Sequence, residues 1–381
     1  MSGIEQGPIR PPSEARSLLL RVTRNCSWNR CGFCHIYKGN RFSLRTVQEV
    51  RRDIDAVKGI VDGLKSDSWR QGCGGDITPG IIRTALKNLH RYPEGTRSVL
   101  LWLHNGAKNV FLQDADNLVH KTANLAAMLA YLKEAFPSVE RITTYTRAKT
   151  AARKSVEDLL ELRQAGLSRI HTGLESGCDP VLEMADKGVT ARELVDAGRK
   201  VKASGIELSE YIMPGLGGRR MWREHAVETA RVLNQIDPDF IRLRTLKVLD
   251  IMPLAGKVAS GELELMTDDE IVLELRLLLE NLDGIHSRIT SDHILNLLEE
   301  IDGRLPEDRE KMLEVIDRYL GLPGPERDNF RLGRRASFYR TLDDMDNPEL
   351  RAQVDQIMER IRSRPPGDLD AALSEIMESF I

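Results

Sequence analysis

Short apolar runs alternate with amphipathic segments along the first two thirds of the chain. The apolar runs predict strands at 17–23, 109–113, 141–146, 168–174, 206–213 and 240–246. The segments between them carry apolar residues at helical spacing and predict helices at 44–61, 124–136, 155–166, 191–205 and 222–236. Strands that alternate with helices of crossover length form parallel sheets. The pattern therefore predicts an α/β fold, a partial (β/α)6 TIM-like barrel.

The pattern predicts three parts. Residues 1–16 form an N-terminal arm, residues 17–250 the core barrel, and residues 251–381 a helical C-terminal extension. In the core, Ser43 is the expected N-cap of the first helix. In the extension the strand signals stop, and helices are expected at 267–282, 291–301 and 306–320. In parallel barrels the reactive groups lie at the carboxyl ends of the strands, so that edge is the expected active face.

The composition is that of an ordinary globular protein and excludes few classes of function. The 381 residues are 41% hydrophobic and 30% charged, with a net charge of -3, so no nucleic-acid partner is expected. No apolar run approaches the ~18 residues of a membrane span, and the first residues have no signal-peptide pattern. We expect no membrane partner and a cytoplasmic location.

The stretch CSWNRCGFC (26–34) holds three of the five cysteines: Cys26, Cys31 and Cys34. Three thiolates can hold three irons of a [4Fe–4S] cluster and leave the fourth iron open to a ligand from outside the protein. A structural zinc site would need a fourth protein ligand. The candidates for that alternative are His35, Cys73 and Cys178.

The cysteine run and two later motifs resemble the radical S-adenosylmethionine (radical SAM) superfamily. The segments RIHTGLESGCDPVLEMADKG (169–188) and YIMPGLGG (211–218) are similar to the branch of oxygen-independent coproporphyrinogen oxidases, methylthiotransferases and the Elongator catalytic subunit. The resemblance covers residues 17 to 250. The chain has C-x4-C-x2-C where that family has C-x3-C-x2-C, which suggests a distinct, unassigned subgroup.

The resemblance implies an oxygen-sensitive enzyme of oxidoreductase or lyase type. It would cleave S-adenosylmethionine reductively with a [4Fe–4S] cluster and abstract a hydrogen atom from an unidentified small organic substrate. A low-potential donor such as flavodoxin or ferredoxin would supply the electron. The alternative is a non-catalytic scaffold on a degenerate barrel that binds zinc or an iron–sulfur cluster.

The resemblance also places side chains around S-adenosylmethionine, while no residue is assigned to catalysis. Phe33 and Tyr37 would pack near the adenine and the cluster, although Phe33 is equally compatible with anchoring the loop. Gln113, Asp114 and Asp116 stand where relatives carry a glycine-rich motif for the methionyl amino group. The alternative for the two aspartates is a cap of the following helix.

The later strands contribute further candidates to the same edge. Glu175 would bind hydroxyls or an amine of the nucleoside, or else pair with Arg147. Lys187 would approach the cofactor carboxylate, or else be a solvated residue at a helix end. Met213 begins the segment that brings backbone close to the adenine. Arg242 and Arg244 are expected to face the same way, either into the barrel or toward its rim.

Overall fold

The computed structural model describes residues 3–363 and 368–380 and divides into two compact units. Unit 1 comprises Met1–Asn29, Ile36–Thr172 and Asp196–Leu208, and unit 2 comprises Arg30–His35, Gly173–Val195 and Ser209–Ile381. Residues 1–2 of the predicted arm, and residues 364–367 and 381 of the predicted extension, lie outside the described residues. The three-part division proposed from the sequence stays a prediction.

The main sheet has eight strands in the order β1-β4-β5-β6-β7-β8-β9-β10 and is mostly parallel. Its strands are β1 (Leu18–Arg21), β4 (Asn109–Gln113), β5 (Arg141–Thr146), β6 (Leu167–Glu175), β7 (Glu207–Ile212), β8 (Phe240–Leu243), β9 (Arg288–Thr290) and β10 (Gly303–Arg304). Buried residues run almost without interruption along β1, β4 and β6, as expected for strands covered on both faces. The predicted α/β class with a parallel sheet is confirmed and is consistent with a partial barrel.

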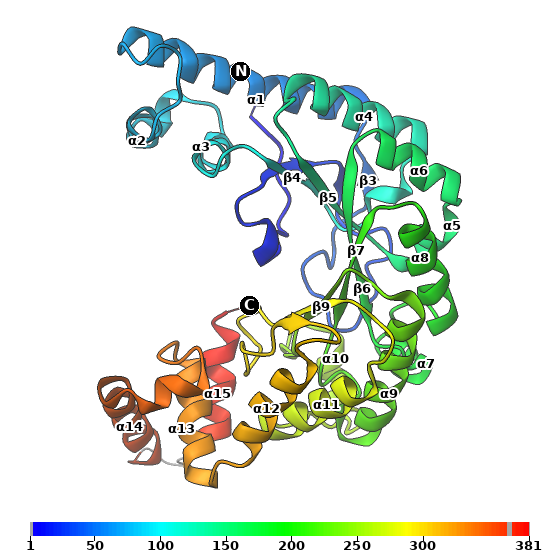
Figure 1. Ribbon diagram of the computed structural model, residues 1–381, viewed down its shortest axis with the longest axis vertical. Coiled ribbons are helices and arrows are strands. Elements are labelled where there is room, and N and C mark those ends of the chain that lie inside the picture. The colour runs from blue at the N-terminus through cyan, green and yellow to red at the C-terminus, as the bar shows by residue number, and fades with distance from the viewer. Residues whose placement is uncertain (1–2, 364–367, 381) are drawn as a thin grey trace. The chain divides into compact units, whose positions relative to one another are not determined.

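In unit 1, a layer of helices covers the strands β1, β4 and β5 (Figure 1). The helices within this unit are α1 (Val47–Arg70), α2 (Pro79–Lys87), α3 (Thr96–His104), α4 (Thr122–Ala135), α5 (Ala148–Arg153) and α6 (Val156–Gln164). The prediction that Ser43 caps α1 is wrong. Thr46 is the N-cap and forms a capping box with Glu49, whereas Ser43 lies in β3 (Ser43–Leu44), which pairs with β2 (Thr23–Arg24).

In unit 2, α11 packs on α9 and on α12, and α13 packs on α14 and α15 (Figure 1). The helices of this unit are α7 (Asp179–Met184), α9 (Gly218–Ile236), α10 (Leu254–Ala259), α11 (Asp268–Asn281), α12 (Arg309–Leu320), α13 (Gly324–Arg335), α14 (Pro348–Ser363) and α15 (Leu369–Glu378). Helix α8 (Ala191–Ala203) is shared between the units. Within the described residues, no helix is both long and apolar enough to cross a bilayer.

Two expectations for the C-terminal part are wrong. Strand signals do not stop at residue 250, because β9 pairs in parallel with β8 and β10 pairs antiparallel with β9. The segment 291–301 is not helical. Its polar residues bond to distant backbone instead: the Asn296 side chain accepts from the Thr245 N–H and donates to the Leu243 carbonyl. These tertiary hydrogen bonds outweigh the local helical pattern.

Candidate functional site

The first half of the cysteine run is held in unit 1 by two asparagines with positive φ. Asn25 has φ 68° and Asn29 has φ 53°, a conformation that asparagine tolerates better than most residues. The Asn29 N–H donates to Cys26 Sγ at 3.4 Å, and the Asn29 side-chain amide donates to the Tyr37 carbonyl at 2.6 Å. The turn therefore directs a backbone donor toward the first thiol.

The second half of the run, residues 30–35, is clamped in unit 2 at Gly32. The Gly32 N–H donates to the Ala185 carbonyl at 2.8 Å, and the Leu254 N–H donates to the Gly32 carbonyl at 3.0 Å. A Cβ on Gly32 would stand 2.9 Å from Leu254 Cγ, so the close approach requires glycine. Phe33 packs against a buried cluster that includes Ala185 and Leu254. Phe33 thus anchors the loop, which was one of the two roles considered for it. Its other predicted role, contact with the adenine, stays a prediction.

The donor set of the run suits an iron–sulfur cluster. Cys26, Cys31 and Cys34 are all partly exposed, so their thiols are accessible for ligation. In residues 3–363 and 368–380, no group of three or more His, Cys, Asp or Glu side chains is arranged to hold a metal ion. A [4Fe–4S] cluster takes each thiolate on a different iron, so its ligands need not converge on one point. The ligand assignment stays a prediction.

The exit of β4 is occupied by the N-terminal arm in unit 1. The Gln113 side chain is fully buried; its Oε1 accepts from the Gly7 N–H at 2.9 Å, and its Nε2 donates to the carbonyls of Gly7 and Ile9 at 3.0 and 2.6 Å. A Cβ on Gly7 would lie 2.1 Å from Asp114 Oδ1. The polar atoms of Gln113 are therefore engaged by the arm.

Asp114 is buried beside the arm and has three partners of its own. It accepts hydrogen bonds from Arg21 Nε at 2.8 Å, the Asn25 N–H at 3.2 Å and the Tyr37 hydroxyl at 3.1 Å. Burial raises the pKa of Asp114 despite the opposing effect of Arg21. Tyr37, also buried, thus orients this carboxylate, and a cofactor ammonium at Asp114 would have to share it with these donors.

Asp116 ties the cysteine loop to the exit of β5. Its carboxylate is fully buried and accepts from the Ser27 hydroxyl, the Thr146 hydroxyl at 2.9 Å, the Arg147 N–H at 3.1 Å and the Thr150 hydroxyl at 2.8 Å. It makes no side-chain cap bond, so the helix-cap alternative does not describe it. The Arg147 guanidinium lies 4.9 Å from the centre of the Trp28 ring.

An Asp116→Ala variant is expected to lose about 3 kcal/mol of unfolding free energy, since one buried donor and three partly buried donors lose their acceptor at once. Urea unfolding at neutral pH measures the change. The matched control is Asp158→Ala, which removes a partly exposed capping carboxylate of α6 that also accepts from the Thr122 hydroxyl, and it should cost about 1 kcal/mol. A loss at Asp116 no larger than at Asp158 would contradict the role assigned to Asp116.

Unit 2 brings Glu175 and Lys187 together at the end of β6. Glu175 Oε1 accepts from Lys187 Nζ at 2.9 Å, and Gly173 leaves room for the pair because a Cβ there would stand 2.1 Å from Glu175 Oε1. The Lys187 side chain is only 12% exposed, so it is not the solvated residue of the alternative interpretation. Its ammonium lies 5.4 Å from the centre of the Phe33 ring. The pair thus lies beside the anchor of the cysteine loop.

Glu210 on β7 completes this cluster and was not predicted from the sequence. It is fully buried, and its Oε2 has no hydrogen-bond partner among the described residues. Burial raises the pKa of Glu210 to about 8, with Lys187 opposing and Glu175 reinforcing the shift. At neutral pH its carboxyl group is therefore protonated and can donate a hydrogen bond. A glutamate inside the apolar run IELSEYIM was the signal available in the sequence.

The exit of β7 is fixed by buried polar groups on neighbouring helices. His225 on α9 hydrogen-bonds to the Met213 carbonyl at 3.1 Å, and Glu274 on α11 accepts from the Gly215 N–H at 3.0 Å. Gly215 has φ 88°, which favours glycine. The backbone of the predicted adenine segment is thus held rigidly in unit 2.

Arg242 and Arg244, which were predicted to face the same way, differ in burial. Arg242 is buried and donates to Ser209 Oγ at 3.2 Å and to Asp292 at 3.1 Å. Arg244 is exposed and lies beyond the last residue of β8, so the strand alternation assumed for it does not apply. Of the two arginines, Arg242 is the one whose guanidinium lies in the interior of unit 2.

Comparison with known proteins confirms the resemblance to the radical SAM superfamily. The family model of that description matches residues 87–230. A tRNA uridine(34) acetyltransferase of Methanocaldococcus jannaschii is 23% identical over 128 residues, which are 33% of this chain and 23% of that protein. The chain thus spans about a quarter of the length of this curated relative. Enzymes of the superfamily use a [4Fe–4S] cluster and S-adenosylmethionine.

Solved structures show similarity at low sequence identity. The archaeal Elp3 of Methanocaldococcus infernus, with an N-terminal deletion, is 16% identical with a TM-score of 0.42 and covers 52% of each chain. Methylornithine synthase (PylB) is 16% identical with a TM-score of 0.43, covering 73% of this chain and 66% of that one.

Proposed function

We propose, from the radical SAM domain over residues 87–230, that this chain is a radical SAM enzyme that abstracts a hydrogen atom from an organic substrate. Cys26, Cys31 and Cys34 would hold a [4Fe–4S] cluster. When bound, the cluster supplies the electron that cleaves the sulfonium of S-adenosylmethionine. The observation that carries the proposal is the cysteine run, whose two halves are each held by specific hydrogen bonds at Asn29 and at Gly32.

The loop contacts would position the thiolates. The clamp at Gly32 fixes the backbone between Cys31 and Cys34, and the Asn29 N–H donates to Cys26 Sγ. Hydrogen bonds to ligand sulfurs stabilise the reduced, more negative state of a cluster and so tune its potential. These residues act through the ligands rather than on the substrate.

The cluster of Glu175, Lys187 and Glu210 would bind polar groups of the cofactor. Lys187 supplies a cation for a carboxylate, and Glu175 supplies an acceptor for hydroxyls. Protonated Glu210 can donate to a hydroxyl oxygen without adding a second negative charge beside Glu175. The apolar surroundings of Phe33 exclude water from this group.

The test is anaerobic reconstitution of the full chain with iron and sulfide, followed by S-adenosylmethionine and dithionite. We expect a bound [4Fe–4S] cluster and 5′-deoxyadenosine by chromatography. Reduced flavodoxin or ferredoxin should replace dithionite. A chain that takes zinc in place of iron, or a cluster that yields no 5′-deoxyadenosine, would favour the non-catalytic scaffold. The class of reaction, oxidoreductase or lyase, follows from the product once a substrate is turned over.

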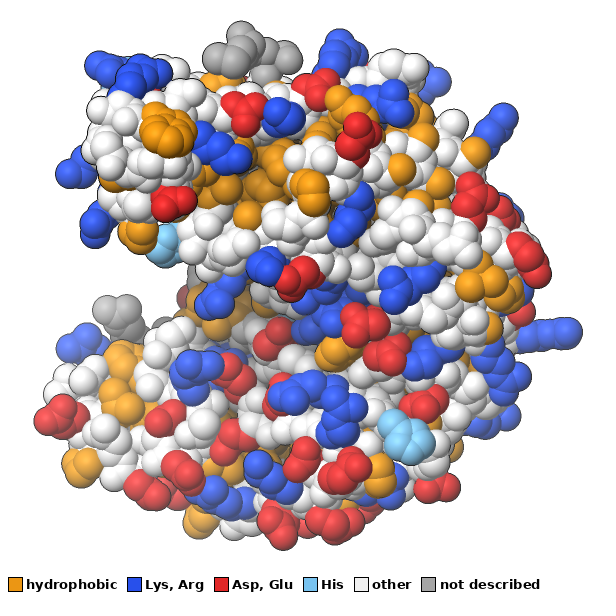
Figure 2. Space-filling model, turned by 45° about the horizontal axis from the view of Figure 1, so that its top comes forward, with side chains coloured by type: hydrophobic (Ala, Val, Ile, Leu, Met, Phe, Trp, Pro, Cys, Tyr) orange, Lys and Arg blue, Asp and Glu red, His pale blue; other side chains and the backbone are white. Residues whose placement is uncertain are grey.

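A tRNA substrate is the second candidate, favoured by the similarity to tRNA uridine(34) acetyltransferases. Against it stand the net charge of -3 and the face in Figure 2, where acidic and basic side chains lie interspersed. A gel-shift titration with total tRNA separates the two candidates. Binding that weakens steeply with salt would support the tRNA substrate, and its absence at low salt would support the small molecule.

A further inference from the structure

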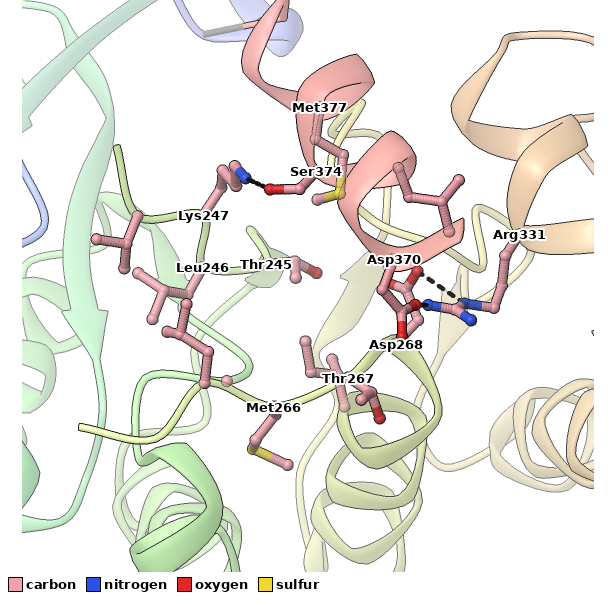
Figure 3. Close-up of a pocket in the computed structure, with 15 residues that line it drawn as sticks. Thr245, Leu246, Lys247, Met266, Thr267, Asp268, Arg331, Asp370, Ser374 and Met377 are labelled. Atoms are coloured by element: carbon pink, nitrogen blue, oxygen red, sulfur yellow. Dashed lines mark hydrogen bonds and ion pairs between the residues drawn. The ribbon is translucent and has the colours of Figure 1, made fainter. Parts of the chain in front are cut away.

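A cavity of about 280 Å³ lies in unit 2 at the carboxyl end of β8 (Figure 3). Most of its lining comes from three segments: the chain that leaves β8 at 245–248, the chain into the start of α11 and the C-terminal helix α15. Gly215 and Arg331 of α13 complete the lining. Its volume is near the lower end of the range for small-molecule sites. The cavity is therefore sized for a small organic ligand.

The walls of the cavity are mostly apolar. Its apolar lining residues are Leu246, Val248, Leu265, Met266, Ile271, Leu373 and Met377. Leu246 and Val248 also pack against the buried cluster that holds Phe33 of the cysteine loop. Gly215, from the predicted adenine segment, lines the cavity as well. The cavity wall and the Phe33 anchor of the cysteine loop thus pack against the same buried cluster.

Two cations line the cavity, and they differ in how their charge is balanced. Arg331 is paired with Asp268 and Asp370. Lys247 is 12% exposed, and its partners in the described chain are the Ser374 hydroxyl and the Glu378 carboxylate at 3.1 Å. Glu378 is 53% exposed, so its attraction to Lys247 is screened by water. Lys247 is therefore the cation at which an incoming anion can exchange with a protein group.

Helix α15 lines the cavity with few buried side chains of its own. Of its ten residues, Leu373 is the one that is fully buried, and the helix packs against α13 and α14. Polar contacts at Asp370, Ser374 and Glu378 add to this attachment. A helix of this length has little stability by itself. Its displacement would open the cavity and release Lys247 at once.

We propose that this cavity binds the apolar part of a small organic carboxylate, whose carboxylate group replaces Glu378 at Lys247. The carboxylate of Glu378 already occupies the position that the ligand group would take. That this cavity is the substrate pocket of a hydrogen-abstracting enzyme rests on the proposed function, because what links the cavity to the cysteine loop is the buried cluster on which Leu246, Val248 and Phe33 all pack. Ligand binding itself does not depend on the cluster.

The test titrates the full chain, without cluster, with octanoate and with octanol by saturation-transfer NMR. The two probes share an apolar tail and differ in the anionic group. We expect Lys247→Met to weaken octanoate at least about tenfold and to leave octanol unchanged. Lys257→Met is the matched control, because Lys257 pairs with the half-exposed Glu262 away from the cavity lining. Leu373→Trp, which fills the cavity, should weaken both probes.

Equal octanoate affinity in wild type and Lys247→Met would overturn the assignment, as would absence of octanoate binding to the wild type. Thermal unfolding confirms that each variant is folded. If Leu373→Trp does not fold, the comparison of wild type with Lys247→Met alone decides whether the cavity is the octanoate site. The proposed function can fail independently of the ligand site. Octanoate binding without 5′-deoxyadenosine formation would reject the radical SAM activity and support the carboxylate site. If 5′-deoxyadenosine forms but Lys247→Met leaves octanoate binding unchanged, the carboxylate site is rejected and the radical SAM activity is supported.

Discussion

A Cys31→Ser variant is expected to lose 5′-deoxyadenosine formation to below detection. Thiolates are the ligands of iron–sulfur clusters, and a serine hydroxyl is not ionised near neutral pH. Loss of one of three protein ligands leaves two irons without one, so the variant should also retain less iron after reconstitution. Iron analysis and chromatography of the nucleoside product, on anaerobic samples prepared in parallel, measure both effects.

Cys73→Ser is the matched control for this variant. Cys73 is also partly exposed but lies outside the run, in the loop between α1 and α2. We expect its iron content and product yield to equal those of the wild type. Full activity in Cys31→Ser would remove the ligand assignment, and equal loss in Cys73→Ser would show that the chain uses a different set of thiols.

The parallel sheet could be predicted because its strands are local apolar runs of distinctive length. Strands β4 and β5 occupy the predicted residues, 109–113 and 141–146. β9 and β10 could not be found in this way, since three and two residues are too short for a periodicity. The segment 291–301 has a helical pattern but follows the hydrogen bonds of Asn296, which depend on residues about fifty positions away.

The candidate site could be predicted only as positions along strand ends. The sequence placed Gln113, Asp114 and Asp116 at the exit of β4, where the structure has them. It could not indicate that the N-terminal arm and the cysteine loop take up their hydrogen-bonding capacity, because those partners lie about ninety or more residues away. Glu210 was missed for a related reason: its burial depends on neighbours that only the folded unit supplies.

Glu274 should make the protein less stable as pH rises, and a Glu274→Gln variant should remove that dependence. The residue is 3% exposed, its Oε1 accepts from the Gly215 N–H, and its Oε2 has no partner among the described residues. Burial raises the pKa of Glu274 to about 8 from an ordinary value of 4.5, although the bond from Gly215 opposes the shift. His225 Nε2 is 3.5 Å away, and burial lowers its pKa to about 4, so it is neutral and does not compensate a carboxylate.

The sign follows from which state holds the proton. Below pH 4.5 both the native and the unfolded state are protonated at Glu274, and its contribution to stability is complete. Between pH 4.5 and about 8 the unfolded state releases the proton while the native state keeps it, so the free energy of unfolding falls by as much as about 1.4 kcal/mol per pH unit. Glutamine keeps the acceptor for Gly215 and does not titrate. The variant should therefore gain stability over the wild type steadily from pH 5 to pH 8, as measured by urea unfolding.

Glu270→Gln, on the same helix, is the control for this pH series. Burial alone would raise the pKa of Glu270, but the backbone hydrogen bond from Thr267 and the contacts with Arg219 outweigh it, and the pKa is lowered. Glu270 is thus ionised in both states above pH 5, and its variant should differ from the wild type by a constant amount in this range. A flat difference for Glu274→Gln as well would mean that this carboxyl is ionised in the folded chain. The exit of β7 would then carry a buried negative charge beside Gly215.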